Sequence, residues 1–158
     1  MKFLKKSSDI GIYRLLQCLI KGNSIKESGI TISFEERDLT DEEILLIINI
    51  DIDKNHLKCL KQFVALDKGI AIPDLLLLYA IYNNGNILTK FFIVDLGPHK
   101  ESELTKKEQG ACILFEKLDI QIKKFKFFNV IKGSSHGKHK KYRAIRPGDL
   151  LKEIRKSG

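Results

Sequence analysis

Two long apolar runs near the middle of the chain dominate its hydrophobic pattern. They span residues 75–82 and 87–96 and flank the sequence Asn83-Asn84-Gly85-Asn86. Runs of this length, rich in β-branched and aromatic residues, favour strands buried on both faces over helices. The Asn/Gly cluster supplies residues that tolerate positive φ in a tight turn. The pattern therefore predicts a central pair of strands against which the rest of the chain packs.

The amino-terminal half of the chain predicts two amphipathic helices. Ser7 or Ser8 can cap the first, whose apolar residues recur at helical spacing until Gly22 ends it. The second begins at Asp53 and closes at Gly69. The start of the chain has the outline of a signal peptide, but charged residues interrupt its apolar stretch and no small-residue cleavage site follows. We therefore interpret this stretch as a helix.

Between these two helices the pattern indicates strands. The segment 29–34 alternates as a short strand should. Thr40-Asp-Glu-Glu43 matches a capping box, in which the Thr hydroxyl caps a helix and the Glu reaches back to an amide. The β-branched residues that follow favour a strand. We expect a short helical turn that runs into a strand over 46–52.

The carboxyl-terminal half continues with alternating helix and strand. Thr105-Lys-Lys-Glu108 matches a second capping box, and the helix that it begins continues through Leu118. A strand over 120–131 comes next, and a short final helix over 149–156 follows a basic loop. This order predicts a single α/β domain over 1–158, with a mixed or mainly parallel sheet and helices on its faces.

Composition limits the class of protein. A chain of 158 residues with 43% hydrophobic and 30% charged residues is typical of one globular domain. No run approaches the roughly 18 to 20 apolar residues of a membrane span, so we expect no membrane partner. Cys18, Cys59 and Cys112 lack metal-ligand spacing, and their odd number does not indicate a disulfide framework. We expect buried thiols in a reducing compartment, the cytoplasm.

The positive charge is confined to the last quarter of the chain. Residues 1–120 hold 16 Lys/Arg and 18 Asp/Glu, a net charge of −2, whereas residues 121–158 hold 12 Lys/Arg and two acidic residues, a net charge of +10. The whole formal charge of +8 therefore belongs to this last quarter. Such asymmetry predicts a surface that meets a polyanion.

The basic loop over 132–148 combines the residue types that bind phosphates. Gly and Ser let backbone amides approach a phosphate, Lys and Arg neutralise it, and Tyr142 offers a ring for stacking. His136 and His139 lack a Cys or acidic partner at ligand spacing, so we predict no metal there. A solvated loop that only aids solubility is the alternative. The candidate nucleic-acid-binding residues are Lys132, His136, Lys138, His139, Lys140, Lys141, Tyr142, Arg143 and Arg146.

Lys90 and Asp95 are the candidates for chemistry on the central strands. Opposite parity puts them on opposite faces of a strand, unless Asp95 lies at its carboxyl end, where ligands and catalytic groups gather in open α/β sheets. An edge lysine and a loop-capping aspartate are the alternative, which the residues alone favour. No glycine-rich phosphate loop and no nucleophile elbow occurs in the sequence.

Five segments between residues 70 and 158 resemble, in order, the catalytic domain of leucyl aminopeptidases, the two-metal M17 family. The family has an apolar strand after proline, a strand with a lysine and a metal-binding aspartate five residues later, a helix that opens with Gly-Gly-Ala, a further strand, and a Tyr-Arg-Pro-Gly-Asp segment. The matching segments here are Pro73-Asp-Leu-Leu-Leu-Leu78, Thr89–Gly97 with Lys90 and Asp95, Gly110-Ala111, Lys126–Ile131 and Tyr142–Leu151.

The chain departs from this family at the metal ligands. Lys107 stands where the family has a metal-binding aspartate, and the segment that supplies two further acidic ligands would follow Gly158. A two-metal aminopeptidase needs several carboxylates to hold both ions. With at most Lys90 and Asp95 retained as vestigial candidates, the resemblance implies a truncated remnant reused for binding. We expect no catalytic residue and no cofactor.

These observations lead to one expected function and two alternatives. We expect a non-catalytic accessory protein of the cytoplasm, whose basic carboxyl-terminal region contacts RNA or a ribonucleoprotein such as the ribosome. One alternative is a divalent-metal, aminopeptidase-like enzyme that uses Lys90 and Asp95. The other is a protein–protein scaffold that acts through the first amphipathic helix, with a basic tail that only solubilises.

Overall fold

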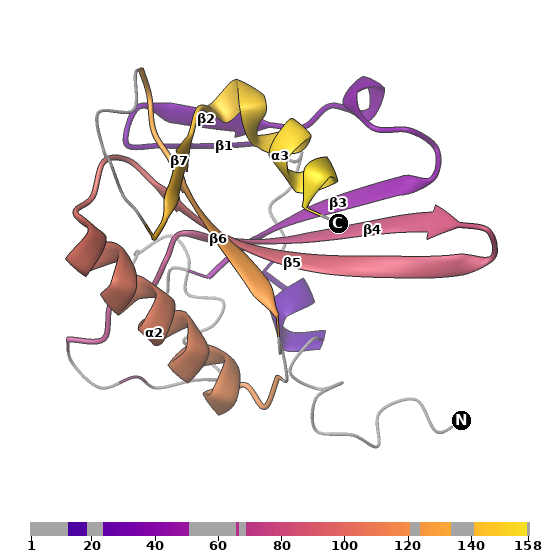
Figure 1. Ribbon diagram of the computed structural model, residues 1–158. Coiled ribbons are helices and arrows are strands. Elements are labelled where there is room, and N and C mark those ends of the chain that lie inside the picture. The colour runs from indigo at the N-terminus through magenta and orange to yellow at the C-terminus, as the bar shows by residue number, and fades with distance from the viewer. Residues whose placement is uncertain are drawn as a thin grey trace.

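The computed structural model describes residues 13–18, 24–50, 66, 69–120, 124–133 and 141–157. These residues form a five-stranded sheet, a separate two-stranded sheet and the helices α2 and α3 (Figure 1). The elements are β1 (Ser24–Glu27), β2 (Ile30–Ser33), β3 (Glu43–Asn49), β4 (Leu75–Asn83), β5 (Asn86–Leu96), α2 (Glu101–Lys117), β6 (Phe125–Val130), β7 (Arg143–Ile145) and α3 (Leu150–Lys156), with single 3-10 turns at Glu36–Asp38 and Pro147–Asp149.

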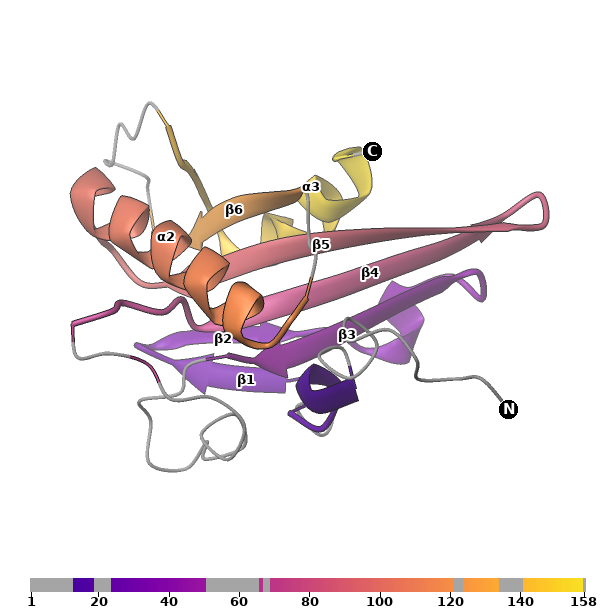
Figure 2. The same ribbon diagram turned by 90° about the horizontal axis from the view of Figure 1, so that it is seen from below.

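The predicted central strand pair is confirmed as the hairpin of β4 and β5. Asn83 pairs with Asn86 across a two-residue turn in which Asn84 has φ 49° and Gly85 has φ 83°. Positive φ at both turn positions is the geometry whose twist matches paired strands. Burial on both faces holds only away from the turn, because the tip of the hairpin extends beyond the neighbouring elements (Figure 2).

The five-stranded sheet is mixed, as predicted, and has the order β3-β4-β5-β6-β7. Neighbouring strands are antiparallel from β3 to β5 and parallel from β5 to β7. α2 provides the crossover between β5 and β6, as a parallel pair requires. The carboxyl ends of β5, β6 and β7 therefore lie at one edge of the sheet.

Two apolar clusters form the core, and alternate residues of a strand belong to different clusters. In β5, Phe92 and Val94 lie in one cluster and Ile93 in the other. The Ile93 cluster includes Leu114 of α2, and the Phe92 cluster includes residues of β2 and α3. α2 lies close against the chain before β4, since a Cβ added at Gly110 would lie 1.6 Å from the carbonyl oxygen of Ala71.

The capping box predicted at Thr40 does not begin a helix. The Thr40 N–H donates to the Glu43 carboxylate at 3.0 Å, as in a capping box, but β3 starts at Glu43 and pairs with β4. The residues after Glu43 are apolar and rich in isoleucine, and Leu45 and Ile47 are buried in the Phe92 cluster and Ile48 in the Ile93 cluster. Strand pairing therefore overrides the local helix signal.

The helix start predicted from the second capping box is wrong by five residues. α2 begins at Glu101, where Glu103 accepts a hydrogen bond from the Lys100 N–H at 3.0 Å. Thr105 lies inside the helix and its hydroxyl donates to the Glu101 carbonyl at 3.0 Å. The acidic residues of the first turn, Glu101 and Glu103, stabilise a helix that begins here, because their negative charges interact favourably with the positive end of the helix dipole.

The remaining sequence-based elements are partly confirmed. β2 matches the strand predicted over 29–34, but its partner β1 was not predicted, although Ser28 and Gly29 form a turn with positive φ between them. Residues 13–16 are helical, whereas Ser7 and Ser8 lie outside the described residues. Of the helix predicted from Asp53 to Gly69 only Leu66 and Gly69 are described, and neither is helical, while the strand predicted over 120–131 is shorter, at 125–130.

The prediction of buried, free thiols is wrong for two of the three cysteines. Cys18 is 7% exposed and disulfide-bonded, and Cys112 is a free thiol on the exposed side of α2. Cys59 lies outside the described residues. Among the described residues, no helix has the length and apolar character of a membrane span.

Candidate functional site

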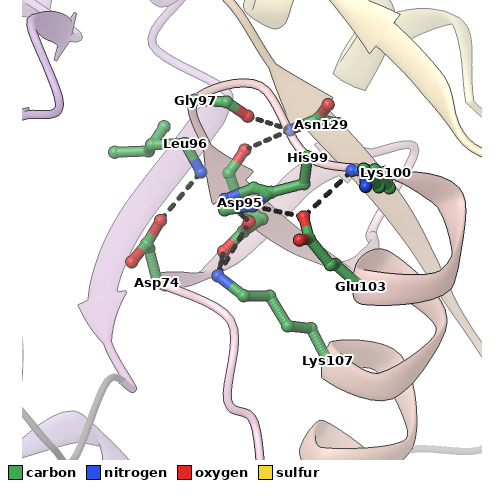
Figure 3. A network of polar contacts seen from close by, with 9 residues as sticks. All are labelled: Asp74, Asp95, Leu96, Gly97, His99, Lys100, Glu103, Lys107 and Asn129. Carbon is green, nitrogen blue, oxygen red and sulfur yellow. Dashed lines mark hydrogen bonds and ion pairs between the residues drawn. The ribbon is translucent and has the colours of Figure 1, made fainter. Parts of the chain in front are cut away.

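A buried polar cluster lies at the edge of the sheet where β5 and β6 end. Asp95 is the last residue but one of β5, and Asn129 is its partner in register on β6. Asp74 directly precedes the adjacent strand β4, and His99 and Lys107 come from the loop after β5 and from α2. Figure 3 shows these side chains converging on Asp95. The carboxyl edge of parallel strands is where α/β sheets gather functional groups.

Asp95 is the centre of this cluster and is fully buried. The Lys107 ammonium donates to both of its carboxylate oxygens, at 2.8 and 3.0 Å. The His99 Nε2 lies 2.9 Å from the Asp95 Oδ2. His99 also contacts Glu103 through its Nδ1 at 3.2 Å, so it lies between the buried carboxylate and an exposed one.

The surroundings of Asp95 favour its neutral form. Burial and, after it, the neighbouring Asp74 carboxyl raise the pKa of the Asp95 carboxyl and the ammonium of Lys107 lowers it, with a net rise to about 7. Asp74 also accepts a hydrogen bond from the Leu96 N–H at 2.8 Å. The cluster therefore holds two buried carboxyl groups side by side, with one lysine as their cation.

Asn129 fixes the backbone around the site. Its Nδ2 donates to the carbonyls of Asp95 and Gly97, at 3.2 and 2.8 Å. Gly97 has φ 99°, a conformation in which a side chain would be strained, and its N–H donates to the Val130 carbonyl at 2.8 Å. These bonds hold the end of β5 against β6 and set the direction of the loop that carries His99.

The Asp95 carboxylate is saturated by side chains of the cluster, whereas the buried Oδ1 of Asn129 accepts no hydrogen bond from the described residues. Both oxygens of Asp95 are occupied by Lys107, and His99 covers one of them toward solvent. In the described part of the chain, no three His, Cys, Asp or Glu residues are arranged to hold a metal ion. The arrangement can fix the edge of the sheet and exchange a proton near neutral pH.

Lys90 and Asp95 lie on opposite faces of β5, as their parity predicted. The Lys90 Nζ lies 5.9 Å from the centroid of the Tyr79 ring, and Tyr79 belongs to the Phe92 cluster. Asp95 points to the other face, where α2 supplies Lys107. The two candidates therefore do not form one site.

Four of the predicted nucleic-acid-binding residues are described and exposed: Lys132, Lys141, Arg143 and Arg146. Arg143 pairs with Glu153 at 2.8 Å, and the Arg146 Nε donates to the Gly133 carbonyl at 3.3 Å. Arg143 is the first residue of β7, and the other three lie close to the ends of β6 and β7. His136, Lys138, His139 and Lys140 lie outside the described residues.

The stacking role predicted for Tyr142 needs correction. Its side chain is buried, with 3% of the residue exposed, and its ring lies 5.2 Å from that of Phe127. Its hydroxyl donates to Thr105 at 3.1 Å, and Lys141 lies 5.4 Å from its ring centroid. The ring is buried and the hydroxyl is bonded, so Tyr142 anchors β7 to α2 and offers no exposed ring to a base.

The described part of the first amphipathic segment packs on the protein itself. Leu15 and Cys18 are buried in the Ile93 cluster, and the Asn49 N–H donates to the Cys18 carbonyl at 3.2 Å. Tyr13 is exposed. The apolar side chains of Leu15 and Cys18 are therefore used within the fold.

Sequence reasoning named Asp95 but missed the residues around it. Asp74 after a proline, His99 after Gly-Pro and Asn129 in a strand are polar residues next to strand ends, and that placement was the available signal. Lys107 was noted only as a departure from the aminopeptidases. No family model matches the chain, and no curated protein or solved structure matches it either.

Proposed function

We propose that this protein is a non-catalytic accessory protein that binds RNA or a ribonucleoprotein through its basic carboxyl-terminal region. The observation that carries the proposal is the charge distribution: residues 121–158 have a net charge of +10 and the rest of the chain a net charge of −2. A basic region of this size attracts phosphates without needing a dedicated nucleic-acid fold.

The described basic side chains support a common surface. Lys132 follows β6, Arg143 begins β7 and Arg146 follows it, and these strands are paired. All three side chains are exposed, and the Arg146 contact with Gly133 ties the two strand ends together. A phosphate chain passing this edge of the sheet would meet several cations at once.

The buried cluster supports a binding role over a catalytic one. The ammonium of Lys107 occupies both oxygens of Asp95, and Asp95 is not accessible to solvent. Kinship with the leucyl aminopeptidases is part of the proposal, and the order of β4, β5, α2 and β6 supports it. On that view a lysine has taken the position of a metal-binding aspartate and supplies the positive charge itself.

A cytoplasmic location is part of the proposal, and the state of the cysteines bears on it. It was inferred from free thiols, and Cys18 is disulfide-bonded. Cytosolic proteins rarely keep disulfides. Alkylation of thiols at the moment of cell lysis decides the point: labelling of Cys18 supports the cytoplasm, and protection of Cys18 beside a labelled Cys112 overturns it.

Co-sedimentation with ribosomes and with bulk RNA, over a series of salt concentrations, tests the function. We expect association at low salt that falls steeply as salt rises. Replacing Lys138, Lys140, Lys141 and Arg143 with Gln should abolish it. Lys106 and Lys117, which are exposed on α2, provide the control, and their replacement with Gln should leave association unchanged. Equal binding by both variants, or no binding at low salt, would contradict the proposal.

A divalent-metal, aminopeptidase-like enzyme is the second candidate. Asp95 favours it, because this carboxyl lies at the carboxyl end of β5 with Asp74 and His99 beside it. Elemental analysis of the purified protein and a peptidase assay test this candidate. Bound zinc or manganese, together with activity that Asp95→Asn abolishes, would replace the RNA-binding proposal.

A further inference from the structure

β5 runs past β6 and leaves an open edge. β6 pairs with β5 only over Phe91–Leu96. Residues Asn86–Lys90 of β5 have β4 on one side, and no strand in the described part of the chain pairs with them on the other. Figure 2 shows this end of the hairpin extending away from the rest of the fold. We call residues Asn86–Lys90 the open edge.

The backbone of the open edge offers unpaired hydrogen-bonding groups. The Gly97 N–H donates to Val130 of β6, so Gly97 directs its backbone groups toward β6. Alternate residues along a strand share this direction, which assigns Ile87 and Thr89 to the same side. Both residues are exposed, and no described residue bonds to their N–H or C=O groups on that side. An added strand would find two donors and two acceptors there.

The side chains around the open edge are apolar although water surrounds them. Ile87 is 70% exposed and Leu88 52% exposed, and they project to opposite faces of the sheet. Tyr82 lies opposite Ile87, and Ile44 of β3 is also exposed on this part of the sheet. The described part of the chain has five exposed large hydrophobic residues, and these four of them lie together here. Exposed apolar residues that cluster in this way indicate an interaction surface, whereas single scattered ones do not.

A groove of about 720 Å³ adjoins the open edge where β6 begins. Its lining includes Lys90, Lys124 and Lys126, with Phe91 and Phe125 half-buried beside them. Glu108 is the one acidic residue among the described lining residues. We call it the lysine groove. Three ammonium groups against one carboxylate favour an anionic occupant.

We propose that the open edge and the lysine groove bind an extended acidic peptide segment of a partner protein. The segment adds to β5 as a strand, in line with β6, and its backbone bonds to Ile87 and Thr89. Its apolar side chains cover Ile87 on one face and Leu88 on the other. Its carboxylates meet Lys124 and Lys126 at the end of the strand.

The observations favour a peptide over a nucleic acid at this place. Free N–H and C=O groups in strand geometry can hydrogen-bond to another strand. The apolar side chains on both faces can be covered by that strand too, because its successive side chains point to opposite faces. A single nucleic-acid strand would use the lysines and leave both of these features unsatisfied. The inference does not depend on RNA binding by the basic region.

A short labelled peptide tests the proposal. The probe is a fluorescein-labelled eight-residue peptide with four valines at one end, which reach both faces of a strand, and four aspartates or glutamates at the other, and its binding to the full chain is measured by fluorescence anisotropy. Thr89→Pro removes the N–H on the open side and keeps the pairing with β4, because proline is tolerated on a strand edge. We expect at least fivefold weaker binding for Thr89→Pro and wild-type binding for Thr89→Ala, which keeps the N–H.

Charge variants test the groove separately. The double variant Lys124→Glu/Lys126→Glu should weaken binding of the acidic peptide by at least tenfold. The matched variant Lys106→Glu/Lys117→Glu, on the exposed side of α2, should leave it unchanged. A peptide with the same four valines and with lysines in place of the acidic residues should not bind. Circular dichroism of each variant shows whether the fold is kept, and co-sedimentation with RNA should be unchanged for Thr89→Pro.

Three results would overturn the proposal. The first is the absence of binding by the acidic peptide at low salt. The second is displacement of the bound peptide by an oligouridylate, with Lys124→Glu/Lys126→Glu losing RNA binding, which would assign the lysine groove to nucleic acid. The third is a dimer in sedimentation velocity that Thr89→Pro dissociates, which would make a second copy of the chain the occupant of the open edge.

Discussion

The carboxyl group of Asp95 shows how one buried residue can make stability depend on pH. Its pKa rises from 3.8 to about 7, first through burial and then through Asp74, against the opposing effect of Lys107. A carboxyl group that binds its proton more tightly in the folded state favours folding at low pH. This contribution is complete below about 3.8 and is lost as the pH rises through about 7.

Asp95→Asn should remove this dependence. We expect the free energy of unfolding of the variant, minus that of the wild type, to increase between pH 4 and pH 7 and to stay constant above. Urea denaturation at each pH measures the difference. Asp74, His99, Glu103 and Lys107 also face the site. A difference that is the same at all pH values would show that Asp95 titrates normally.

Lys107→Ala should cost most where Asp95 is ionised. Removing one partner of a buried ion pair costs about 3–5 kcal/mol, because the other charge is left uncompensated. We expect a cost of this order at pH 8 and a smaller one at pH 5, where Asp95 is protonated. Lys106→Ala, one residue away and exposed, should change the unfolding free energy by less than about 0.5 kcal/mol. Equal costs for Lys107→Ala at both pH values would contradict the assignment.

At the scale of residues, the sequence predicts Asp95 as a member of the site but not the side chains that contact it. Asp95 was found because strand parity and strand ends are local properties of a sequence. Lys107 lies 12 residues further on, and its contact depends on where α2 begins. The expected start near Thr105 gave no basis for placing Lys107 beside β5. An error of about one helical turn was enough to hide the partner.

At the scale of elements, one ion-pair network joins β3, β4 and α3. The Arg155 guanidinium donates to both oxygens of Glu43, at 2.7 and 2.9 Å, and to the Asp38 carbonyl at 2.7 Å. The Tyr79 hydroxyl donates to Glu43 at 2.5 Å. The Arg155 bonds lower the pKa of Glu43 to about 2, and burial with the Glu43 bond raises the pKa of Tyr79 to about 12.

Arg155→Ala should loosen α3 from the sheet. We expect a loss of about 2–3 kcal/mol in unfolding free energy at neutral pH, since charged hydrogen bonds to a buried carboxylate are removed. The lowered pKa of Glu43 gives stability that is complete above about 4.5 and is lost as the pH falls toward about 2. In acid denaturation, the unfolding free energy of the variant should fall less over that pH range than that of the wild type.

Lys156→Ala is the control for Arg155→Ala, because Lys156 is exposed and adjacent. It should change neither the unfolding free energy at neutral pH nor the decrease of that free energy in acid. If Arg155→Ala behaved in the same way, the network would not hold α3. The network also explains the failed helix prediction at Thr40: Glu43 has a local partner in the Thr40 N–H and stronger ones in Tyr79 and Arg155, which no local pattern reveals.

For the whole molecule, the sequence predicted the α/β class, the hairpin and the mixed sheet. These depend on apolar runs and on the order of elements, which are read along the chain. It did not predict that β7, with only Arg143–Ile145, would complete the sheet, because three residues carry no periodicity. The open edge was not predicted either, because the hydrophobic patterns of β5 and β6 do not show at which residue of β5 the pairing with β6 begins.

The uneven charge of the whole molecule predicts the salt dependence of RNA binding. The logarithm of the association constant should fall linearly with the logarithm of the salt concentration, with a slope of roughly −0.7 for each phosphate contact to a single strand. Replacing Lys138, Lys140, Lys141 and Arg143 with Gln should therefore reduce the slope by up to roughly 3. An unchanged slope would locate the phosphate contacts elsewhere on the molecule.

The contact between Arg155 and Glu43 also has a consequence for synthesis of the protein. These residues are separated by 112 positions, so β3 reaches the ribosome exit well before the side chain that neutralises Glu43 has been made. At about 5–20 residues per second, the delay is roughly 6 to 22 seconds. During this interval the Glu43 carboxylate of β3 lacks its cation, and the strand is held less firmly and is more exposed to chaperones and proteases. A nascent chain stalled before α3 should be a substrate for both.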